Sequence, residues 1–177
     1  MAEKISGMTK CQIAGMAGKS LMKKITLISN SAAQTKRIGK ILGKFLLPGS
    51  VVALQGELGS GKTTLVKGIA KGLGVASEKM VSSPTFVLIH EYEGREKIYH
   101  LDWYRLRAVE GTDESLAEEC FNSQAVTLVE WPERGKTLIP RKALAIQLSH
   151  CGLRSRNILV SFPASPAPEL LKELKRI

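Results

Sequence analysis

The sequence predicts an α/β fold with a mostly parallel central sheet flanked by helices, with antiparallel strands added. Residues 51–54 form a short, apolar run without alternation, as expected of a buried parallel strand. A glycine-rich segment follows and leads into a helical pattern from residue 62 onward, with Gly74 at the position of a C-terminal cap. Two strand-like runs, 85–92 and 97–102, are joined by a short glycine-containing connection, which is typical of a hairpin.

The remaining elements follow from the same periodicities. Apolar residues at helical spacing predict a helix over 31–47, which Pro48 and Gly49 close. Thr112, followed by two acidic residues, marks the start of another helix, which ends near Phe121. We expect further strands at residues 25–28, 125–130, 143–148 and 157–162, and a short basic helix at 166–177.

Length and composition indicate one compact domain. The chain has 177 residues, of which 44% are hydrophobic and 24% charged, an ordinary composition for a single core. We expect the domain to span residues 22–165, with a disordered extension at 1–21 and a short basic tail or helix at 166–177.

The extension lacks the apolar segment of a secretory signal, and Met22 is an alternative start, so residues 1–21 are hypothesised to be non-native. No charge-free stretch reaches the roughly 20 apolar residues of a membrane span.

Charge and cysteine content restrict the partners and the compartment. Lys and Arg number 26 against 16 Asp and Glu, a formal net charge of +10. Such a field attracts RNA or an acidic partner, although a nucleotide site with a basic tail explains the excess equally well. No RNA-binding motif with stacking aromatics accompanies this positive charge.

The cysteines Cys11, Cys120 and Cys151 are widely spaced, which indicates neither a disulfide framework nor a zinc site and favours a reducing cytoplasm.

The strongest motif is a phosphate-binding loop. Residues 56–63 read Gly-Glu-Leu-Gly-Ser-Gly-Lys-Thr and satisfy the pattern G-x-x-x-x-G-K-[ST] in full. The glycines let backbone N–H groups wrap the phosphates, Lys62 reaches the outer phosphates, and Thr63 ligates Mg²⁺ at the positive end of the following helix. Its place between a predicted strand and a predicted helix favours a P-loop NTPase-like fold that binds ATP or GTP with Mg²⁺, over a structural glycine turn.

A P-loop enzyme also needs carboxylates at strand ends, to hold Mg²⁺ and to orient the nucleophile. Glu130 and Asp102 each end an apolar strand and are the candidates, although such a residue can also be a cap or a solvated loop residue. The segment 82–86 resembles a switch whose hydroxyl senses the terminal phosphate, or else forms a plain proline turn. Trp131 fits a stacking residue or a hydrophobic plug, and His100 fits a core residue as well as a catalytic one.

Four motifs follow one another along the chain: Gly-Ser-Gly-Lys-Thr-Thr at 59–64, Ser-Pro-Thr-Phe at 83–86, His-Leu-Asp-Trp-Tyr-Arg-Leu at 100–106, and Val-Glu-Trp-Pro-Glu at 129–133. In this order and spacing they resemble the bacterial TsaE (YjeE) family, over about residues 25–162. The resemblance implies a cytoplasmic ATPase, needed with its partners TsaB and TsaD for the threonylcarbamoyl modification of adenosine 37 in tRNAs that read codons beginning with adenine. Hydrolysis, slow alone, would support turnover of the partner complex, with tRNA contacted indirectly or directly.

The resemblance also implies roles for individual residues. The phosphate-binding residues would be Gly59, Ser60, Gly61, Lys62, Thr63 and Thr64. The magnesium ligands would be Thr63 and Glu130, and the catalytic residues Lys62, Glu130 and Asp102.

Further residues of the family hold the nucleotide or face the partner. Thr35 and Arg154 are the nearest matches to family residues that bind the nucleotide outside the P-loop. Arg156 competes with Arg154 for this role, because the stretch 152–156 aligns ambiguously. The switch-like or partner-facing residues would be Ser83, Thr85 and Trp131.

Two other functions compete with this one. A P-loop small-molecule kinase combines the same loop with strand-end acids, but usually carries an arginine-rich lid helix, whereas here the chain after Glu130 turns within a few residues to a strand pair. A nucleotide-dependent binding module with negligible turnover has the same sequence features as a slow ATPase. The guanine-reading motif Asn-Lys-x-Asp does not occur in the sequence, which favours ATP over GTP.

Overall fold

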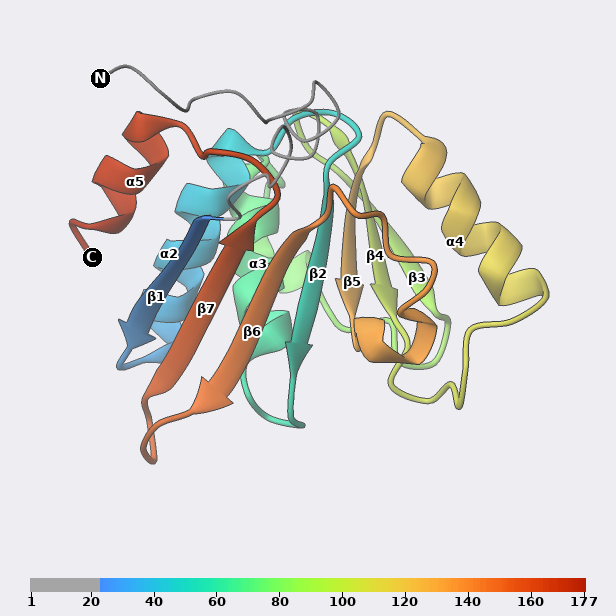
Figure 1. The fold of residues 1–177 in the computed structure, drawn as a ribbon, viewed down its shortest axis with the longest axis horizontal. Helices are drawn as coiled ribbons and strands as arrows, with labels where there is room; N and C mark the ends of the chain where they lie inside the picture. The colour runs from blue at the N-terminus through green and yellow to red at the C-terminus, as the bar shows by residue number, and fades with distance from the viewer. Residues whose placement is uncertain (1–22) are drawn as a thin grey trace, which may run out of the picture.

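The computed structural model describes residues 23–177, so the predicted extension at 1–21 lies outside the described residues. The described residues form a seven-stranded sheet in the order β1-β7-β6-β2-β5-β4-β3 (Figure 1). The middle strands β6, β2, β5 and β4 are mutually parallel, whereas β1, β7 and β3 pair antiparallel at the two sides. This arrangement confirms the predicted α/β fold with a parallel centre and added antiparallel strands.

The elements begin and end close to the residues that the sequence patterns indicate. The strands are β1 (Lys23–Ser29), β2 (Val51–Gly56), β3 (Ile89–Glu93), β4 (Lys97–Asp102), β5 (Val126–Glu130), β6 (Leu144–His150) and β7 (Arg156–Phe162). The helices are α2 (Ala32–Phe45), α3 (Lys62–Gly72), α4 (Thr112–Asn122) and α5 (Pro168–Leu174), with 3₁₀ turns η1 (Glu78–Met80) and η2 (Pro132–Gly135).

One predicted strand is wrong in its first half. Residues 85–88 do not extend strand β3, which begins only at Ile89. The carbonyl of Pro84 accepts hydrogen bonds from the N–H groups of Val87 (3.0 Å) and Leu88 (2.8 Å), and Leu88 takes a positive φ of 66°. The apolar and β-branched residues of this segment favour a strand, but the proline-initiated turn prevails.

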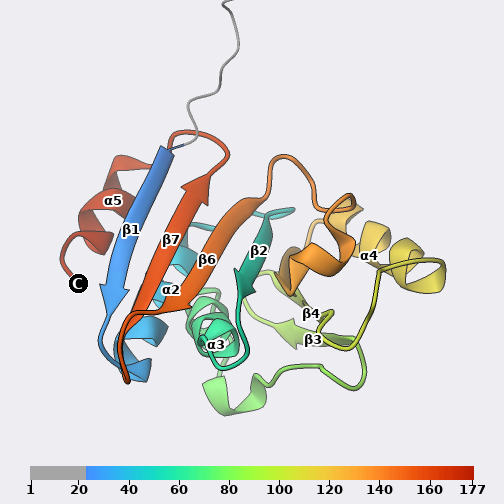
Figure 2. The same cartoon turned by 60° about the horizontal axis from the view of Figure 1, so that its bottom comes forward.

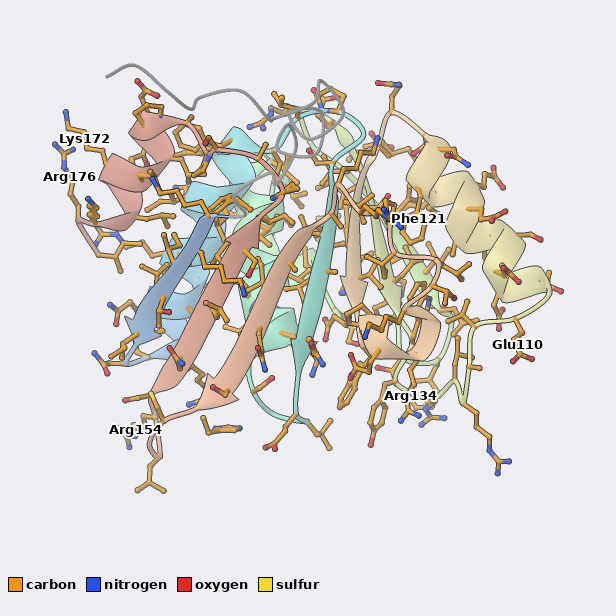
Figure 3. The ribbon with its side chains drawn as sticks, in the orientation of Figure 1. Glu110, Phe121, Arg134, Arg154, Lys172 and Arg176 are labelled. Atoms are coloured by element: carbon orange, nitrogen blue, oxygen red, sulfur yellow. The ribbon has the colours of Figure 1, made fainter. Side chains whose placement is uncertain are left out.

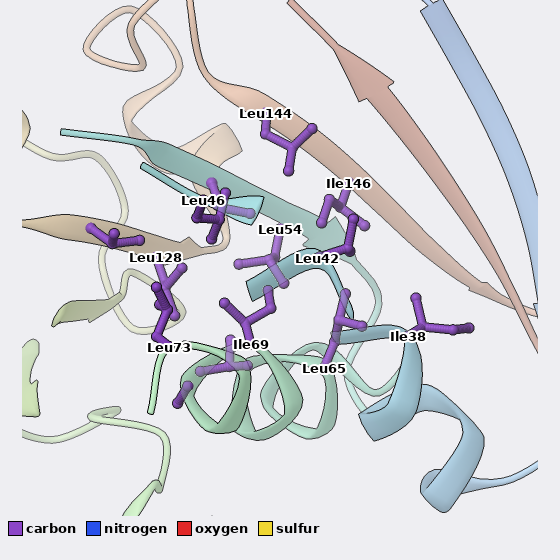
Figure 4. Packing of buried hydrophobic residues seen from close by; sticks show 14 of the residues in the cluster. Ile38, Leu42, Leu46, Leu54, Leu65, Ile69, Leu73, Leu128, Leu144 and Ile146 are labelled. Atoms are coloured by element: carbon purple, nitrogen blue, oxygen red, sulfur yellow. The ribbon is translucent and has the colours of Figure 1, made fainter. Parts of the chain in front are cut away.

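Helices cover the sheet on both faces, and alternation along the strands divides the core accordingly. Val52 and Leu54 of β2 point into a large cluster with α2, α3 and α5 (Figure 4). Val51 of β2 and Val129 of β5 point the other way, into a smaller cluster with Phe121 of α4. The turned view shows α2 and α3 on one side of the sheet and α4 at its β4 end (Figure 2). Strands β2 and β5 are thus buried on both faces, as central parallel strands are, whereas β6 alternates between buried and exposed residues.

Helices α2 and α3 touch through their backbones. A Cβ atom added at Gly43 would lie 2.2 Å from the carbonyl oxygen of Ile69, and one at Gly68 would lie 2.2 Å from that of Lys36. Only glycine permits such an approach, so α2 is fixed closely against the helix that follows the P-loop. Arg95, from the β3–β4 connection, donates to the carbonyl oxygens of Gly43 (3.0 Å) and Leu46 (2.6 Å), which satisfies groups at the end of α2.

The C-terminal helix α5 packs on the domain. Leu170 and Leu174 are buried in the large cluster, and Glu173 forms an ion pair with Lys44 of α2 at 3.0 Å. Within residues 23–177, no helix is long and apolar enough to cross a membrane.

Candidate functional site

The glycine loop connects the end of β2 to the start of α3. Gly59 and Gly61 have positive φ angles of 76° and 102°, which side chains disfavour, and Gly61 is the N-cap of α3. A Cβ atom at Gly56 would lie 2.4 Å from the carbonyl oxygen of Leu148 in the neighbouring strand. No side chain caps α3, so its first N–H groups stay available to an anion.

Lys62 folds back over the loop and is almost fully buried. Its Nζ donates hydrogen bonds to the carbonyl oxygens of Gly56 (2.8 Å) and Glu57 (3.0 Å) and lies 3.9 Å from the ring centroid of Trp131. Burial lowers the pKa of the Lys62 ammonium from its ordinary value, although nearby carboxylates, Glu130 first among them, raise it. An ammonium held by carbonyls and a ring face can exchange these partners for phosphate oxygens.

Thr63 and Glu130 meet across the loop. Thr63 lies in the first turn of α3, and its hydroxyl donates toward Glu130, at 2.8 Å from Oε1 and 3.1 Å from Oε2. Glu130 ends β5 and is 2% exposed. His100 of β4 lies on the other side of this carboxylate, with its Nε2 3.0 Å from Oε1.

Asp102 ends β4 beside Glu130, to which it is paired in register. Its Oδ2 accepts hydrogen bonds from Ser83 and from Thr85, the latter at 2.7 Å, and its Oδ1 accepts one from the backbone N–H of Tyr104 at 2.9 Å. Since Ser83 and Thr85 precede β3, this carboxylate holds the connection between η1 and β3 against the site.

Trp131 closes the site over Lys62. It adopts a left-handed conformation (φ 60°, ψ 48°) immediately before η2, and its ring lies 5.0 Å from that of Tyr104. The left-handed residue reverses the chain after β5 and turns the indole back toward the P-loop. Trp131 therefore contacts the site, and it also packs against the smaller hydrophobic cluster.

Most of the predicted site residues line the same cavity, of about 290 Å³. Its predicted lining residues are Gly59, Gly61, Lys62, Thr63, Thr64, Ser83, Thr85, Asp102, Glu130 and Trp131. Ser60 does not line it, because its side chain is fully buried beneath the loop. A larger cavity, about 440 Å³, lies at the opposite end of β2, and Lys142 is its only charged lining residue within 23–177, so these residues offer little chemistry there.

The residues predicted to hold the rest of the nucleotide lie around an adjoining cavity of about 380 Å³, lined by Thr35, Arg154 and Arg156 together with Gly59. Thr35 is 2% exposed, and its hydroxyl is 2.7 Å from Ser29 Oγ and donates to the carbonyl of Ser31 at 3.2 Å. These bonds fix the start of α2.

The two arginines differ in position. Arg154 lies on the exposed β6–β7 connection (Figure 3). Arg156 begins β7, and its Nε lies 3.9 Å from the position of a Cβ atom at Gly61. Arg156 is thus placed over the P-loop by the sheet itself, whereas Arg154 is presented by a loop.

Sequence reasoning left two residues without a defined role. His100 contacts Glu130, and Tyr104 lines the cavity and packs on Trp131. The signal for His100 was its period-2 spacing from Asp102, because alternate residues of a strand share a face. Nothing in the sequence pattern indicated the contact of Tyr104 with Trp131, since it depends on the left-handed turn.

The fold and the glycine loop define a protein of the P-loop class. The model of the family described as "Threonylcarbamoyl adenosine biosynthesis protein TsaE" matches residues 29–158. The chain belongs to this TsaE family.

Individual relatives agree with the family match. The chain is 42% identical over 134 residues to the tRNA threonylcarbamoyladenosine biosynthesis protein TsaE of Treponema pallidum, covering 76% of this chain and 98% of that relative. It is 38% identical over 157 residues to the protein of the same name from Bacillus subtilis, covering 88% and 96%. The crystal structure of Bacillus subtilis YdiB superimposes with a TM-score of 0.69 at 33% identity, covering 88% of this chain and 97% of that one.

Proposed function

We propose that this chain is a Mg²⁺-dependent ATPase that acts with TsaB and TsaD to form the threonylcarbamoyl group on adenosine 37 of tRNAs reading codons that begin with adenine. The observation that carries the proposal is the convergence of Lys62, Thr63, Glu130 and Asp102 on one cavity beside the P-loop. Membership of the TsaE family supports the tRNA part. Hydrolysis is slow in the isolated protein and coupled to the partner complex in the cytoplasm.

In this function, the P-loop and Lys62 hold the phosphates of ATP. The loop N–H groups at the start of α3 and the Lys62 ammonium supply the positive charge that a triphosphate needs. The Lys62 ammonium already lies over the loop, 2.8 Å from the carbonyl oxygen of Gly56 and 3.0 Å from that of Glu57. Arg156, at the rim of the adjoining cavity, is favoured over Arg154 as the arginine that contacts the nucleotide, because a strand positions it.

Thr63 and Glu130 suit a magnesium ion by their donor chemistry. Both offer hard oxygens, and their 2.8 Å contact brings these oxygens to one place. Among the described residues, no group of three or more His, Cys, Asp or Glu side chains could hold a metal. In nucleotide sites Mg²⁺ takes one or two protein ligands and completes its shell with phosphates and water, a role that Thr63 and Glu130 suit. When bound, the ion neutralises charge that develops on the phosphates.

Asp102 is the residue that orients the attacking water in this proposal. It lies at the end of the strand next to Glu130, and its side chain binds the hydroxyls of Ser83 and Thr85. These hydroxyls belong to a switch-like segment. If they exchanged their hydrogen bonds to Asp102 for bonds to the terminal phosphate, the Asp102 carboxylate would be released from them.

The kinase alternative would favour a lid helix after Glu130. Between Glu130 and the start of β6, the described chain contains the 3₁₀ turn η2 and no longer helix that could serve as a lid. The same segment carries Trp131 over the P-loop lysine.

The deciding experiment measures ATP hydrolysis by the purified chain with Mg²⁺, alone and with TsaB and TsaD, together with the threonylcarbamoyladenosine content of tRNA. We expect hydrolysis to rise with the partners and tRNA modification to proceed through repeated turnovers. If TsaB and TsaD leave the hydrolysis rate unchanged and phosphate is transferred to a metabolite, the proposal is refuted in favour of a kinase.

A further inference from the structure

His100 occupies a position that packing alone does not explain. It is fully buried in β4, flanked in the sheet by Leu128 of β5 and His90 of β3. Within residues 23–177, its Nδ1 has no hydrogen-bond partner. A buried polar atom without a partner is costly, and an apolar side chain of similar size would avoid that cost. The imidazole must therefore have a compensating interaction elsewhere.

That interaction is with Glu130. Nε2 of His100 lies 3.0 Å from Oε1, and a carboxylate can only accept a hydrogen bond, so Nε2 is the donor of this bond. Oε1 therefore has two donors, His100 Nε2 and Thr63 Oγ1 at 2.8 Å. Oε2 contacts only Thr63, at 3.1 Å, among the described residues. The two carboxylate oxygens are thus unequal: Oε1 is held by His100 of the sheet and by Thr63 of the P-loop helix, whereas Oε2 is held by Thr63 only, among the described residues.

The geometry points to His100 as a positioning residue for Glu130: its hydrogen bond to Oε1 would hold the carboxylate in place at the proposed cation site. This role rests on the proposed function. Thr63 alone cannot hold Glu130 well, because its hydroxyl oxygen is itself a proposed ligand and shifts when the cation binds. His100 belongs to a different element, strand β4, is itself fully buried and does not line the cavity, so its hydrogen bond is independent of the ligand. Hydrogen bonds that orient a ligating carboxylate raise metal affinity.

The test compares the full chain with His100→Leu, which removes the donor, and His100→Gln, which can present an N–H near the position of Nε2. Thr127→Val is the matched control. Thr127 is equally buried, on β5, and its hydroxyl donates to the carbonyl of Cys120 at 3.1 Å, so this variant loses a buried hydrogen bond between β5 and α4, away from Glu130. Lys62→Ala is made in parallel to probe the nucleotide site itself.

The measured quantity is the dissociation constant of a non-hydrolysable ATP analogue, determined by calorimetry in EDTA and in excess Mg²⁺. The dissociation constant in EDTA divided by that in Mg²⁺ reports the coupling between cation and nucleotide binding. We expect His100→Leu to leave binding in EDTA unchanged and to reduce the ratio by about tenfold or more. His100→Gln should recover most of the ratio, and Thr127→Val should keep it. Melting temperatures establish that each variant is folded.

The outcomes separate this role from the proposed function. If the parent binds no analogue in either condition, the proposed function itself is refuted. If the parent binds, Lys62→Ala does not, and His100→Leu retains the parent ratio, only the positioning role of His100 is refuted. Should His100→Leu fail to fold, His100→Gln is compared with the shorter His100→Asn, which cannot reach Glu130. Equal ratios in these two variants would then overturn the role.

Discussion

The two walls of the candidate site are built differently. The P-loop wall rests on backbone contacts, since α3 lies directly on α2 through Gly43 and Gly68 and the loop is held under Leu148 through Gly56. The opposite wall, around residues 82–88, rests on side-chain hydrogen bonds from Ser83 and Thr85 to Asp102. Close backbone packing leaves one arrangement, whereas a few hydroxyl contacts can be exchanged. The P-loop wall is thus preformed, whereas the opposite wall is suited to change its hydrogen bonds when a ligand binds.

The largest expected effect is on the P-loop wall, with Lys62→Ala. Removing the ammonium takes away a charge that is already aimed at the phosphates, so hydrolysis should fall by at least about 100-fold. The melting temperature of the free chain should fall little or rise, because burial of this ammonium opposes its charged form. ATP hydrolysis and thermal unfolding measure the two effects, and unchanged turnover would remove Lys62 from the phosphate site.

The backbone contact of that wall is broken by Gly68→Ala. A Cβ atom there would lie 2.2 Å from the carbonyl oxygen of Lys36, so α2 and α3 must separate. We expect a net loss of about 1–3 kcal/mol in the free energy of unfolding, even though alanine has the higher helix propensity by about 1 kcal/mol. The control is Gly152→Ala, where the nearest atoms lie at 3.7 Å and urea unfolding should be unchanged. Equal effects of the two substitutions would contradict the close-packed interface.

The opposite wall, around residues 82–88, is tested by Ser83→Ala and Thr85→Val. Each removes one hydrogen bond to Asp102 and should lower the free energy of unfolding by about 1 kcal/mol. Amide hydrogen exchange at residues 85–88 should accelerate while that of α3 stays constant, because α3 does not depend on these bonds. Ser115→Ala, an exposed helix position, is the control. Faster exchange throughout α3 would mean that the two walls are one cooperative unit.

The smallest effect concerns a buried group far from both walls. Burial raises the pKa of the Cys120 thiol to about 11, from an ordinary value of 9.0. Between these values the unfolded chain releases a proton that the folded chain keeps, so stability falls as pH rises through this window. At pH 10 the loss amounts to about 1 kcal/mol. Urea unfolding of the parent at pH 8 and pH 10 should show this loss, and Cys120→Ala should lack it; an identical pH dependence in both proteins would contradict burial of the thiol.

Cys151 offers an internal comparison for the same measurement, because it is exposed. Iodoacetamide at pH 8 should modify Cys151 in the folded chain and reach Cys120 only after unfolding in urea. Peptide mapping by mass spectrometry distinguishes the two sites.

Much of this molecule follows from the sequence alone, wherever the determining pattern is local. The motif at residues 56–63 predicted the loop and the helix after it, and it placed Lys62 and Thr63 at the candidate site. The apolar strands that end in Glu130 and Asp102 indicated both carboxylates, because parallel strands bring their C-terminal ends to the same edge. Their paired register in β5 and β4 agrees with that expectation.

Only the tertiary structure decided the contacts between residues far apart in the chain. The attachment of Ser83 to Asp102, the hydrogen bond of His100 to Glu130 and the donation from Arg95 to the end of α2 depend on strand register and side-chain direction. The turn at residues 85–88 was missed because apolar composition favours a strand, while the hydrogen bonds to Pro84 decide otherwise. Local patterns encode elements and motifs, whereas the partners of a buried polar group are set by the assembled sheet.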